Sequence, residues 1–366
     1  MIRRLRDFVN QQNIFSLQLI ISLLWISVQW ICFQKFNIKE GADSPLYLQA
    51  GQDLIEGTFV ADRRIWYLGY CLYIAFIKLF TDSITVIAIG QLIIAYCSMI
   101  LFFRLLFYNF KDQFLAFCGV LMYLGWIPLH EWNFILYTES IFTSLSIITV
   151  YLIFKKKYWS GIVIGILCIL TRPNGILFLL SFCITLFILQ RKTNYKYVFL
   201  IAFLFLGLLI NEMLAYYGPL MIEGYLLPEI IYFQETLKIK PLDNPYLPSK
   251  ELGIITQLFL FAFKNFTYFL KISIVKGSLF MTHIKPYYSL SHNLYSILFL
   301  YPIYIFAVVG IKKSNLTKVE LFGLIYFLLQ LFTISITSEN WDGRFLPPVL
   351  PFVFMLSTKG LKKVFL

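Results

Sequence analysis

The chain has 366 residues, of which 59% are hydrophobic, 19% are aromatic and 14% are charged. Soluble domains carry about 25% charged residues and cannot cover so much apolar surface in one core, so this composition excludes an ordinary soluble protein. The formal net charge is +12. In membrane proteins Lys and Arg collect in cytoplasmic loops and set the orientation, so this excess predicts topology and gives no reason to expect a nucleic-acid partner.

Ten apolar segments are candidates for helices that cross a hydrocarbon core about 30 Å thick. They are, in chain order, 14–33, 84–107, 114–129, 139–154, 158–170, 174–189, 197–217, 294–311, 319–336 and 345–358. The first follows an arginine-rich start and precedes no small-residue cleavage site, so we interpret it as an uncleaved signal anchor. The sequence thus predicts an all-α polytopic membrane protein with about ten transmembrane helices.

Two further apolar segments, 66–80 and 255–281, can be assigned by charge. If both crossed the membrane, three basic groups would move outward, against the positive-inside rule. Those groups are Lys111, Lys155–Lys157 and the Arg191–Lys196 loop. We therefore expect both segments to form juxtamembrane helices in or near the interface, within outer loops 34–83 and 218–293. The expected location is the cell (inner) membrane, with the N-terminus and the C-terminus in the cytoplasm.

No motif in the sequence indicates a metal or cofactor site. The cysteines lie singly, and His130, His283 and His292 lack a Cys or an acidic residue at ligand spacing. A glycine-rich phosphate loop is also missing. We therefore expect no cofactor, while a divalent metal ion stays open.

Asp43 lies in the first outer loop, directly after the first span, and is followed by Ser44 and Pro45. This order is typical of a helix N-terminus, so one interpretation of Asp43 is an N-cap on a surface-lying helix. The other interpretation is functional. A carboxylate at the membrane face, ahead of Arg63 and Arg64, suits a general base paired with a phosphate clamp. The residues alone leave both interpretations open.

Other charged residues on the expected outer side have a structural and a functional interpretation as well. Arg63 and Arg64 suit anchoring to lipid head groups or phosphate binding. Glu139, at the mouth of a span, suits a helix N-terminus or a role in the site, since an acid at the edge of hydrocarbon is costly. Arg172 lies in a Thr-Arg-Pro-Asn turn between two spans, and Arg344 opens the last one.

Taken in order, these segments resemble the GT-C glycosyltransferases, integral membrane enzymes such as the protein mannosyltransferase and aminoarabinose transferase group. The matching features are Asp followed by Tyr-Leu-x-x-Ala after the first span, Gly-Tyr-x-Leu-Tyr, Thr-Glu, Arg-Pro-Asn, and Arg-Phe-Leu-x-Pro before a late span. Each motif alone is weak, and their order over most of the chain carries the resemblance. The usual Pro-Gly-Tyr-Pro lacks both prolines here, in the segment from Tyr67 to Leu72.

The resemblance implies one GT-C-like transmembrane domain over residues 1–366. It also implies an inverting transfer of a sugar from a polyprenyl-phosphate donor to a lipid, glycan or protein acceptor on the outer face. Asp43 would be the catalytic base, and Glu139 would support acceptor binding. The candidates for holding the departing phosphate would be Arg63, Arg64, Arg172 and Arg344. Because this leaving group is already acidic, a base and cations suffice for the reaction.

The alternative function is a transporter or flippase of a lipid-linked glycan. This class predicts charges buried in the middle of spans and an internal repeat. The expected spans hold almost no acidic residues, and the sequence shows no repeat. The transferase is therefore the preferred prediction, with the sugar and the acceptor left open.

Overall fold

The computed structural model describes the chain apart from residues 1, 190–194, 228–229, 231–235, 313–314 and 338–342. In the described part, every regular element is a helix, and the one isolated β-bridge joins Lys39 and Ile135. The prediction of an all-helical protein is therefore confirmed for these residues. The chain divides into two compact units, and each is a body of its own.

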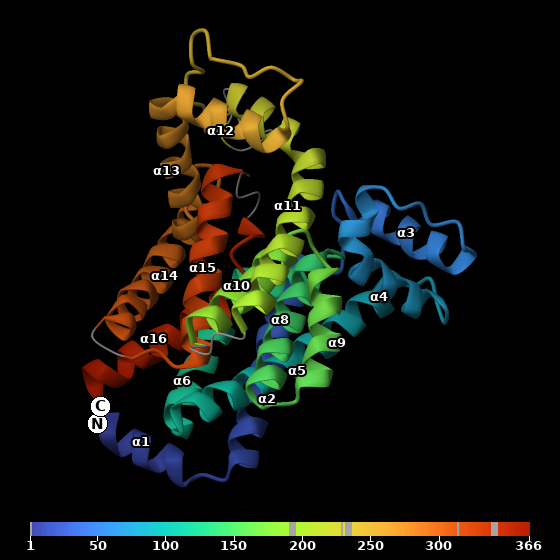
Figure 1. Cartoon of the computed structure of the whole chain (residues 1–366). Coiled ribbons are helices and arrows are strands. Elements are labelled where there is room, and N and C mark those ends of the chain that lie inside the picture. Colours follow the sequence, from blue (N-terminus) through green and yellow to red (C-terminus); the bar gives the residue numbers. More distant parts are fainter. Residues whose placement is uncertain (1, 190–194, 228–229, 231–235, 313–314, 338–342) are drawn as a thin grey trace. The chain divides into compact units, whose positions relative to one another are not determined.

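The first unit comprises Met1–Phe178, Ile303–Leu324 and Pro347–Leu366, and the second comprises Leu179–Pro302 and Ile325–Leu346. The helices up to α8 (Figure 1) are α1 (Ile2–Gln11), α2 (Ile14–Phe36), α3 (Ser44–Glu56), η1 (Arg63–Tyr67), α4 (Leu68–Lys78), α5 (Ile84–Phe110), α6 (Gln113–Gly125), α7 (Ile127–His130), η2 (Glu131–Asn133) and α8 (Thr138–Phe154). The later helices are α9 (Tyr158–Ile169), α10 (Gly175–Leu189), α11 (Tyr195–Leu226), α12 (Ile254–Lys264), α13 (Phe266–Thr282), α14 (Leu290–Ile311), α15 (Lys318–Ile336) and α16 (Leu350–Phe365).

Within the described residues, four helices are long and apolar enough to cross a membrane, namely α2, α5, α14 and α15. The number rises to at most 7 if each of three bent helix pairs counts as one span. The pairs are Gln113–Gly125 with Ile127–Asn133, Phe203–Ala215 with Tyr217–Leu226, and Ile254–Lys264 with Phe266–Thr282. The protein is thus a multi-pass helical membrane protein, while the predicted number of about ten spans is not confirmed.

Two predicted spans take a different form. The segment 114–129 bends by 72° between α6 and α7, where Pro128 lies in the first turn of α7. Proline has no N–H and is tolerated at a helix start, so it favours a new helix over a continued one. The segment 345–358 becomes helical only from Leu350, because two consecutive prolines precede it. The resulting α16 is 16 residues long and ends in a basic turn, and it is not among the candidate spans.

The two segments assigned by charge are helical. In 66–80, α4 covers 11 residues, so at 1.5 Å per residue it is about 16 Å long and too short to cross a membrane. The segment 255–281 forms α12 and α13, which meet at an angle of 100° around Asn265. This bend fits a segment that dips into the interface, and it fits a broken span equally well.

A tyrosine-rich core joins the first loop to the helices that follow it. Tyr47 of α3 packs edge-on against Tyr70 of α4 at 5.3 Å between ring centroids, and Leu136 belongs to the same buried cluster. Gly51 allows α3 and α4 to approach closely, since a Cβ there would lie 2.6 Å from Cγ2 of Ile74. The two helices run side by side (Figure 1). The helices of the first loop therefore pack closely enough to hold the loop's side chains in fixed positions.

In the second unit, α11, α12 and α13 share a smaller aromatic core. Tyr225 lies 5.6 Å from Phe261 between ring centroids, and the Tyr268 hydroxyl donates to the Tyr225 carbonyl at 3.0 Å. At the bend, the Asn265 side chain exchanges two hydrogen bonds of 3.0 Å with the backbone of Tyr246. The bend is thus stabilised by a polar side chain that also anchors the preceding loop.

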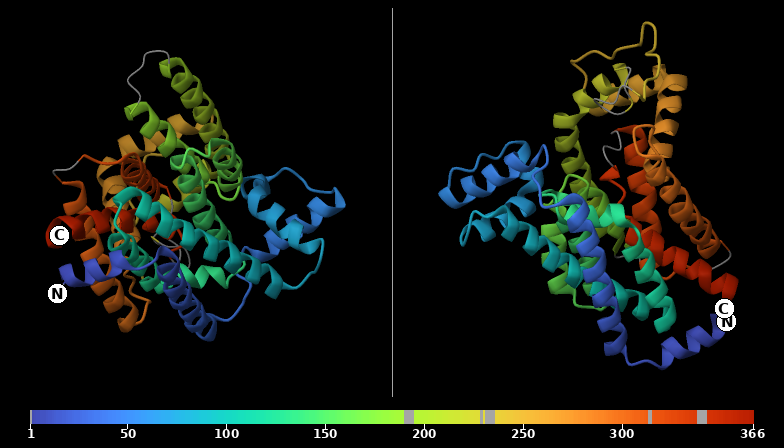
Figure 2. Two further views of the ribbon diagram at one scale, coloured as in Figure 1. Left: turned by 90° about the horizontal axis from the view of Figure 1, so that it is seen from below. Right: turned by 180° about the vertical axis from the view of Figure 1, so that it is seen from behind.

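The two ends of the chain both belong to the first unit. Helix α1 and the last turns of α16 lie near each other in both views of Figure 2, and both helices contact α6. The expectation that the two termini face the same side of the membrane stays a prediction. That this side is the cytoplasm stays a prediction from charge.

Candidate functional site

A short backbone pairing fixes the start of the first loop against the segment before α8. The Lys39 N–H donates to the Phe134 carbonyl at 3.0 Å, and the Leu136 N–H donates to the Lys39 carbonyl at 3.2 Å. These contacts join residues on either side of the whole segment from α3 to η2. The chain just before Asp43 is therefore held beside the N-terminus of α8.

Asp43 directly precedes α3, as expected, but its side chain does not form the N-cap hydrogen bond. Its backbone has φ −89° and ψ −9°, close to helical values, whereas a capping residue needs an extended backbone. The Ser44 hydroxyl instead accepts from the Gly41 N–H at 2.7 Å and donates to the Leu136 carbonyl at 2.8 Å. The position predicted for Asp43 is confirmed, while the capping role of its side chain is wrong.

Tyr137 connects Asp43 with the first turn of α8. The Asp43 backbone N–H donates to the Tyr137 hydroxyl at 3.3 Å. The tyrosine ring stacks on Trp132 at 5.9 Å between centroids. Gly41 packs so closely on the ring that a Cβ there would lie 2.3 Å from Cζ of Tyr137. Sequence reasoning did not single out Tyr137, because one aromatic among 24 tyrosines gives no signal beyond its place before the Thr-Glu motif.

Glu139 and Arg172 form a buried ion pair. Nη1 of Arg172 lies 2.8 Å from Oε1 of Glu139, and their side chains are 5% and 2% exposed. The Thr138 hydroxyl donates to Oε2 of the same carboxylate at 3.3 Å. The Arg172 guanidinium also lies 5.9 Å from the ring centroid of Phe142. Two residues that the sequence proposed separately are therefore neighbours, and each restrains the other.

The turn that carries Arg172 is held by the start of α4. The Gly69 N–H donates to the Leu170 carbonyl at 2.8 Å. A Cβ on Gly69 would lie 2.6 Å from the Leu167 carbonyl oxygen, so only glycine allows this approach. The Gly175 N–H donates to the Arg172 carbonyl at 2.8 Å and closes the turn. The loop that presents Asp43 therefore also supports the segment that presents Arg172.

Tyr70 of α4 is fully buried and lies near Glu139. Burial raises the pKa of Tyr70 well above its usual value, and the nearby Tyr73 and Glu139 raise it further. The neutral hydroxyl donates to Oε1 of Gln91 at 2.7 Å, and Nε2 of Gln91 donates to the Asn133 carbonyl at 3.2 Å. These bonds tie α4 and α5 to the segment before α8.

Arg64 is engaged within the first loop. Its Nη1 lies 2.6 Å from Oδ2 of Asp53, its Nε lies 2.9 Å from Oδ1 of Asp62, and its guanidinium lies 5.4 Å from the ring centroid of Phe59. Arg63, the preceding residue, is exposed. The sequence assigned both arginines to lipid head groups or a phosphate. In the structure, Arg64 stabilises the turn between α3 and η1, while Arg63 faces outward.

Arg344 belongs to the second unit, whereas Asp43 belongs to the first, so the structure does not test their predicted proximity. The Arg344 guanidinium lies 5.4 Å from the ring centroid of Phe345. Nε2 of Gln330 donates to the Phe345 carbonyl at 3.3 Å and fixes this backbone near α15. Residues 338–342, just before Arg344, lie outside the described part of the chain.

A buried polar network that the sequence did not predict joins α2 to the start of α8. Nε2 of His130 meets the Tyr123 carbonyl at 3.1 Å, so this nitrogen carries the proton and Nδ1 accepts from Nε2 of Gln29 at 3.0 Å. Gln29 also accepts from Nδ2 of Asn133 at 2.9 Å, and Asn133 accepts from the Ser140 hydroxyl at 2.6 Å. These satisfied polar groups hold the helix start next to Glu139 in a fixed position.

Among the residues that the structure describes, no group of three or more His, Cys, Asp or Glu side chains could hold a metal ion. In comparisons with known proteins, the chain matches no family model, no curated protein and no solved structure. The function must therefore be argued from the residues of the site.

Proposed function

We propose that this protein is an inverting glycosyltransferase of the GT-C type. It moves a sugar from a polyprenyl-phosphate donor to an acceptor hydroxyl at the extracytoplasmic face of the cell membrane. The observation that carries this proposal is that Asp43, Glu139 and Arg172, which the sequence singled out separately, are linked through the start of α8 in the first unit. Asp43 contacts Tyr137 at the start of α8, and Glu139 of the same helix pairs with Arg172. Carboxylates and a guanidinium gathered at the ends of apolar helices suit a reaction on a lipid-linked phosphate.

In the proposed reaction, Asp43 takes the proton of the acceptor hydroxyl while the hydroxyl oxygen forms a bond to the anomeric carbon. The bond between that carbon and the donor phosphate oxygen breaks, and polyprenyl phosphate leaves with the electron pair. Displacement without a covalent intermediate inverts the anomeric centre. Asp43 suits the base role because it directly precedes α3 in the first loop and its backbone contacts Tyr137 at the start of α8.

The leaving phosphate needs a cation, and Arg172 is the strongest candidate. A guanidinium has five N–H donors, so it can meet a carboxylate and a phosphate at the same time. In this proposal Glu139 is a positioning residue, because its carboxylate fixes Arg172 from one side. Arg63 and Arg344 are further candidates for the phosphate clamp. Arg64 is a weaker candidate, since two loop carboxylates already pair with it.

Sugar transfer by the purified protein in lipid vesicles tests this proposal. The donors are a panel of polyprenyl phosphates linked to radiolabelled sugars, offered with lipid, glycan and protein acceptors. We expect labelled product whose anomeric configuration is opposite to that of the donor. Movement of label across the vesicle without a new glycosidic bond would identify a transporter or flippase instead. A product with retained configuration would contradict the direct displacement by an Asp43-activated hydroxyl.

A further inference from the structure

A basic pocket lies at the opposite end of α2 from the Asp43 loop. It has a volume of about 280 Å³ and lies between the N-terminal turns of α2 and the C-terminal ends of α5 and α8. Its charged lining residues are Arg104, Lys111 and Lys155, and no acidic residue lines it among those described. Such a cluster of cations is suited to an anionic ligand.

Two of these cations share one aromatic ring. The ammonium groups of Lys111 and Lys155 lie 4.6 Å and 4.4 Å from the ring centroid of Tyr108. The shared ring brings two positive charges together at the pocket, where they repel each other in the absence of an anion. The geometry therefore favours a ligand that brings negative charge between them.

The acidic residues near this end of α5 have other partners. Asp112 pairs with Arg6 at 2.7 Å and accepts from the Leu115 N–H at 3.1 Å as the N-cap of α6. Glu320 forms an ion pair with Lys359 and accepts from the side chain of Asn109. In the described part of the chain, no ion pair involves the three pocket cations.

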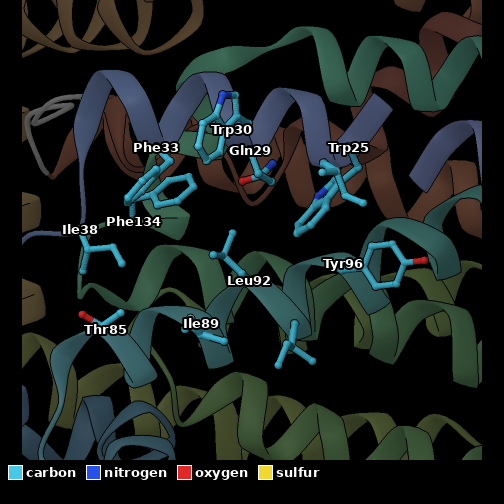
Figure 3. A pocket seen from close by; sticks show the side chains of 12 residues that line it. Trp25, Gln29, Trp30, Phe33, Ile38, Thr85, Ile89, Leu92, Tyr96 and Phe134 are labelled. Carbon is cyan, nitrogen blue, oxygen red and sulfur yellow. The ribbon is translucent and has the colours of Figure 1, made fainter. Parts of the chain in front are cut away.

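An apolar groove continues from the basic pocket along the seam between α2 and α5. Gln18 lines both the basic pocket and a second cavity of about 510 Å³, and Tyr96 lines this cavity and a third one of about 600 Å³. Side chains of α2 and α5 line the third cavity, with Trp25, Trp30 and Leu92 among them (Figure 3). Because α2 and α5 are long enough to span a membrane, this groove lies at a depth where lipid is the solvent.

A polar group at the junction of pocket and groove has no partner. Nε2 of Gln18 is buried and forms no hydrogen bond in the described structure. A buried N–H without an acceptor is destabilising, so an acceptor oxygen brought to this junction would stabilise it. The phosphate or ester oxygens of a phospholipid stand at this height, between the charged head group and the acyl chains.

We propose that the seam between α2 and α5 binds one anionic phospholipid of the surrounding bilayer. Its phosphate lies between Arg104, Lys111 and Lys155, and an acyl chain follows the groove from Gln18 to Tyr96. This site is separate from the Asp43 group and does not depend on the proposed sugar transfer. On the charge-based orientation, the lipid belongs to the cytoplasmic leaflet.

Native mass spectrometry of the full chain in detergent tests the head-group contacts. The probes are phosphatidylglycerol and phosphatidylcholine with identical acyl chains. We expect phosphatidylglycerol to bind more tightly, with each pocket cation contributing about fivefold. The variant Arg104→Gln, Lys111→Gln, Lys155→Gln should lose this preference, and Lys155→Gln alone should weaken phosphatidylglycerol binding about fivefold.

The matched control is Arg3→Gln, Lys157→Gln, Lys362→Gln, which removes the same charge at exposed positions outside the pocket. It should bind phosphatidylglycerol like the wild type. Equal binding of the two lipids by the wild type, or equal effects of the two triple variants, would overturn the proposal.

The acyl chain has a test of its own. Cys97→Trp places an indole in the apolar groove without changing charge, and should weaken the binding of both lipids. Inorganic phosphate should fail to displace bound phosphatidylglycerol, because it lacks the chain. Displacement by phosphate, or unchanged lipid binding in Cys97→Trp, would show that the groove holds no lipid chain.

Discussion

Arg172 and Arg64 are both basic residues on the expected outer side of the membrane, but the structure places them in different environments. Arg172, in the turn after α9, pairs with Glu139 of α8, and their side chains are 5% and 2% exposed. Arg64 pairs within its own loop with Asp53, 14% exposed, and with Asp62, 50% exposed. Solvent screens exposed ion pairs, whereas a buried charge depends on its partner.

This difference separates two tasks that one residue type can perform. Arg64 closes a turn and so stabilises the layer formed by α3 and α4. Arg172 pairs with the Glu139 carboxylate at the start of α8 and lies over the Phe142 ring. A guanidinium held in this way can meet a lipid phosphate without leaving its place. Variants of the two regions should therefore differ in stability and in activity.

The largest stability effect is expected from Arg172→Met. It leaves the Glu139 carboxylate buried without its cation, so the free energy of unfolding should fall by about 3–5 kcal/mol. Denaturation of the protein in mixed micelles, followed by circular dichroism, measures this. Lys78→Met is the control, because its partner Asp82 is 82% exposed and the loss should be about 0–1 kcal/mol. Similar losses in both variants would remove the distinction between the regions.

The double variant Arg172→Met, Glu139→Leu sharpens this test. It removes both charges, so its stability should be closer to that of the wild type than the stability of Arg172→Met is. Sugar transfer should stay low, since the phosphate has lost its cation. A double variant that regains both stability and transfer would assign the pair a purely structural role.

A smaller effect is expected from Gly69→Ala, which tests how the loop supports the Arg172 turn. The added methyl group meets the Leu167 carbonyl oxygen at 2.6 Å, and because this atom is backbone, α4 must move away. We expect the free energy of unfolding to fall by about 1–3 kcal/mol. Gly207→Ala is the control, as no atom beyond its chain neighbours and its own helix backbone lies within 4 Å of the added carbon. Equal stability of Gly69→Ala and the wild type would contradict the close packing of α4 on this turn.

The smallest effect on stability is expected from the pH dependence of the ion pair between Arg64 and the half-exposed Asp62. The Arg64 backbone N–H, together with the Arg64 guanidinium, lowers the pKa of Asp62 below its ordinary value of 3.8. The stability that Asp62 contributes is therefore present above this value and is lost as the pH falls through the lowered pKa. The difference in thermal midpoint between the wild type and Asp62→Asn should be constant above about pH 5 and should shrink below about pH 4. A difference in thermal midpoint that grows on acidification would contradict the lowered pKa of Asp62.

The long helices could be predicted from the sequence because hydropathy is a local property. The apolar runs 14–33 and 319–336 correspond to Ile14–Phe36 and Lys318–Ile336. The bends could not be located in this way. The 100° bend at Asn265 is accompanied by hydrogen bonds with the backbone of Tyr246, and these form only when the preceding loop has folded onto the helix.

The site was predictable residue by residue but not as an arrangement. Asp43, Glu139 and Arg172 stood out as charges at the ends of apolar runs, a pattern that sequence displays directly. The contact between Glu139 and Arg172 arises from the packing of α8 against α9, which no local pattern specifies. Whether Arg64 binds a ligand or Asp53 is likewise decided by the geometry of the loop.

The central claim is that the Asp43 carboxylate acts as the base in sugar transfer. The most direct measurement compares transfer from a polyprenyl-phosphate donor by the wild type, Asp43→Asn and Asp82→Asn. Asp82 is the matched control, since it lies in the same loop and is 82% exposed. We expect Asp43→Asn to slow transfer by about 10²–10⁴-fold and Asp82→Asn to keep the wild-type rate. Transfer at the wild-type rate by Asp43→Asn would contradict the mechanism.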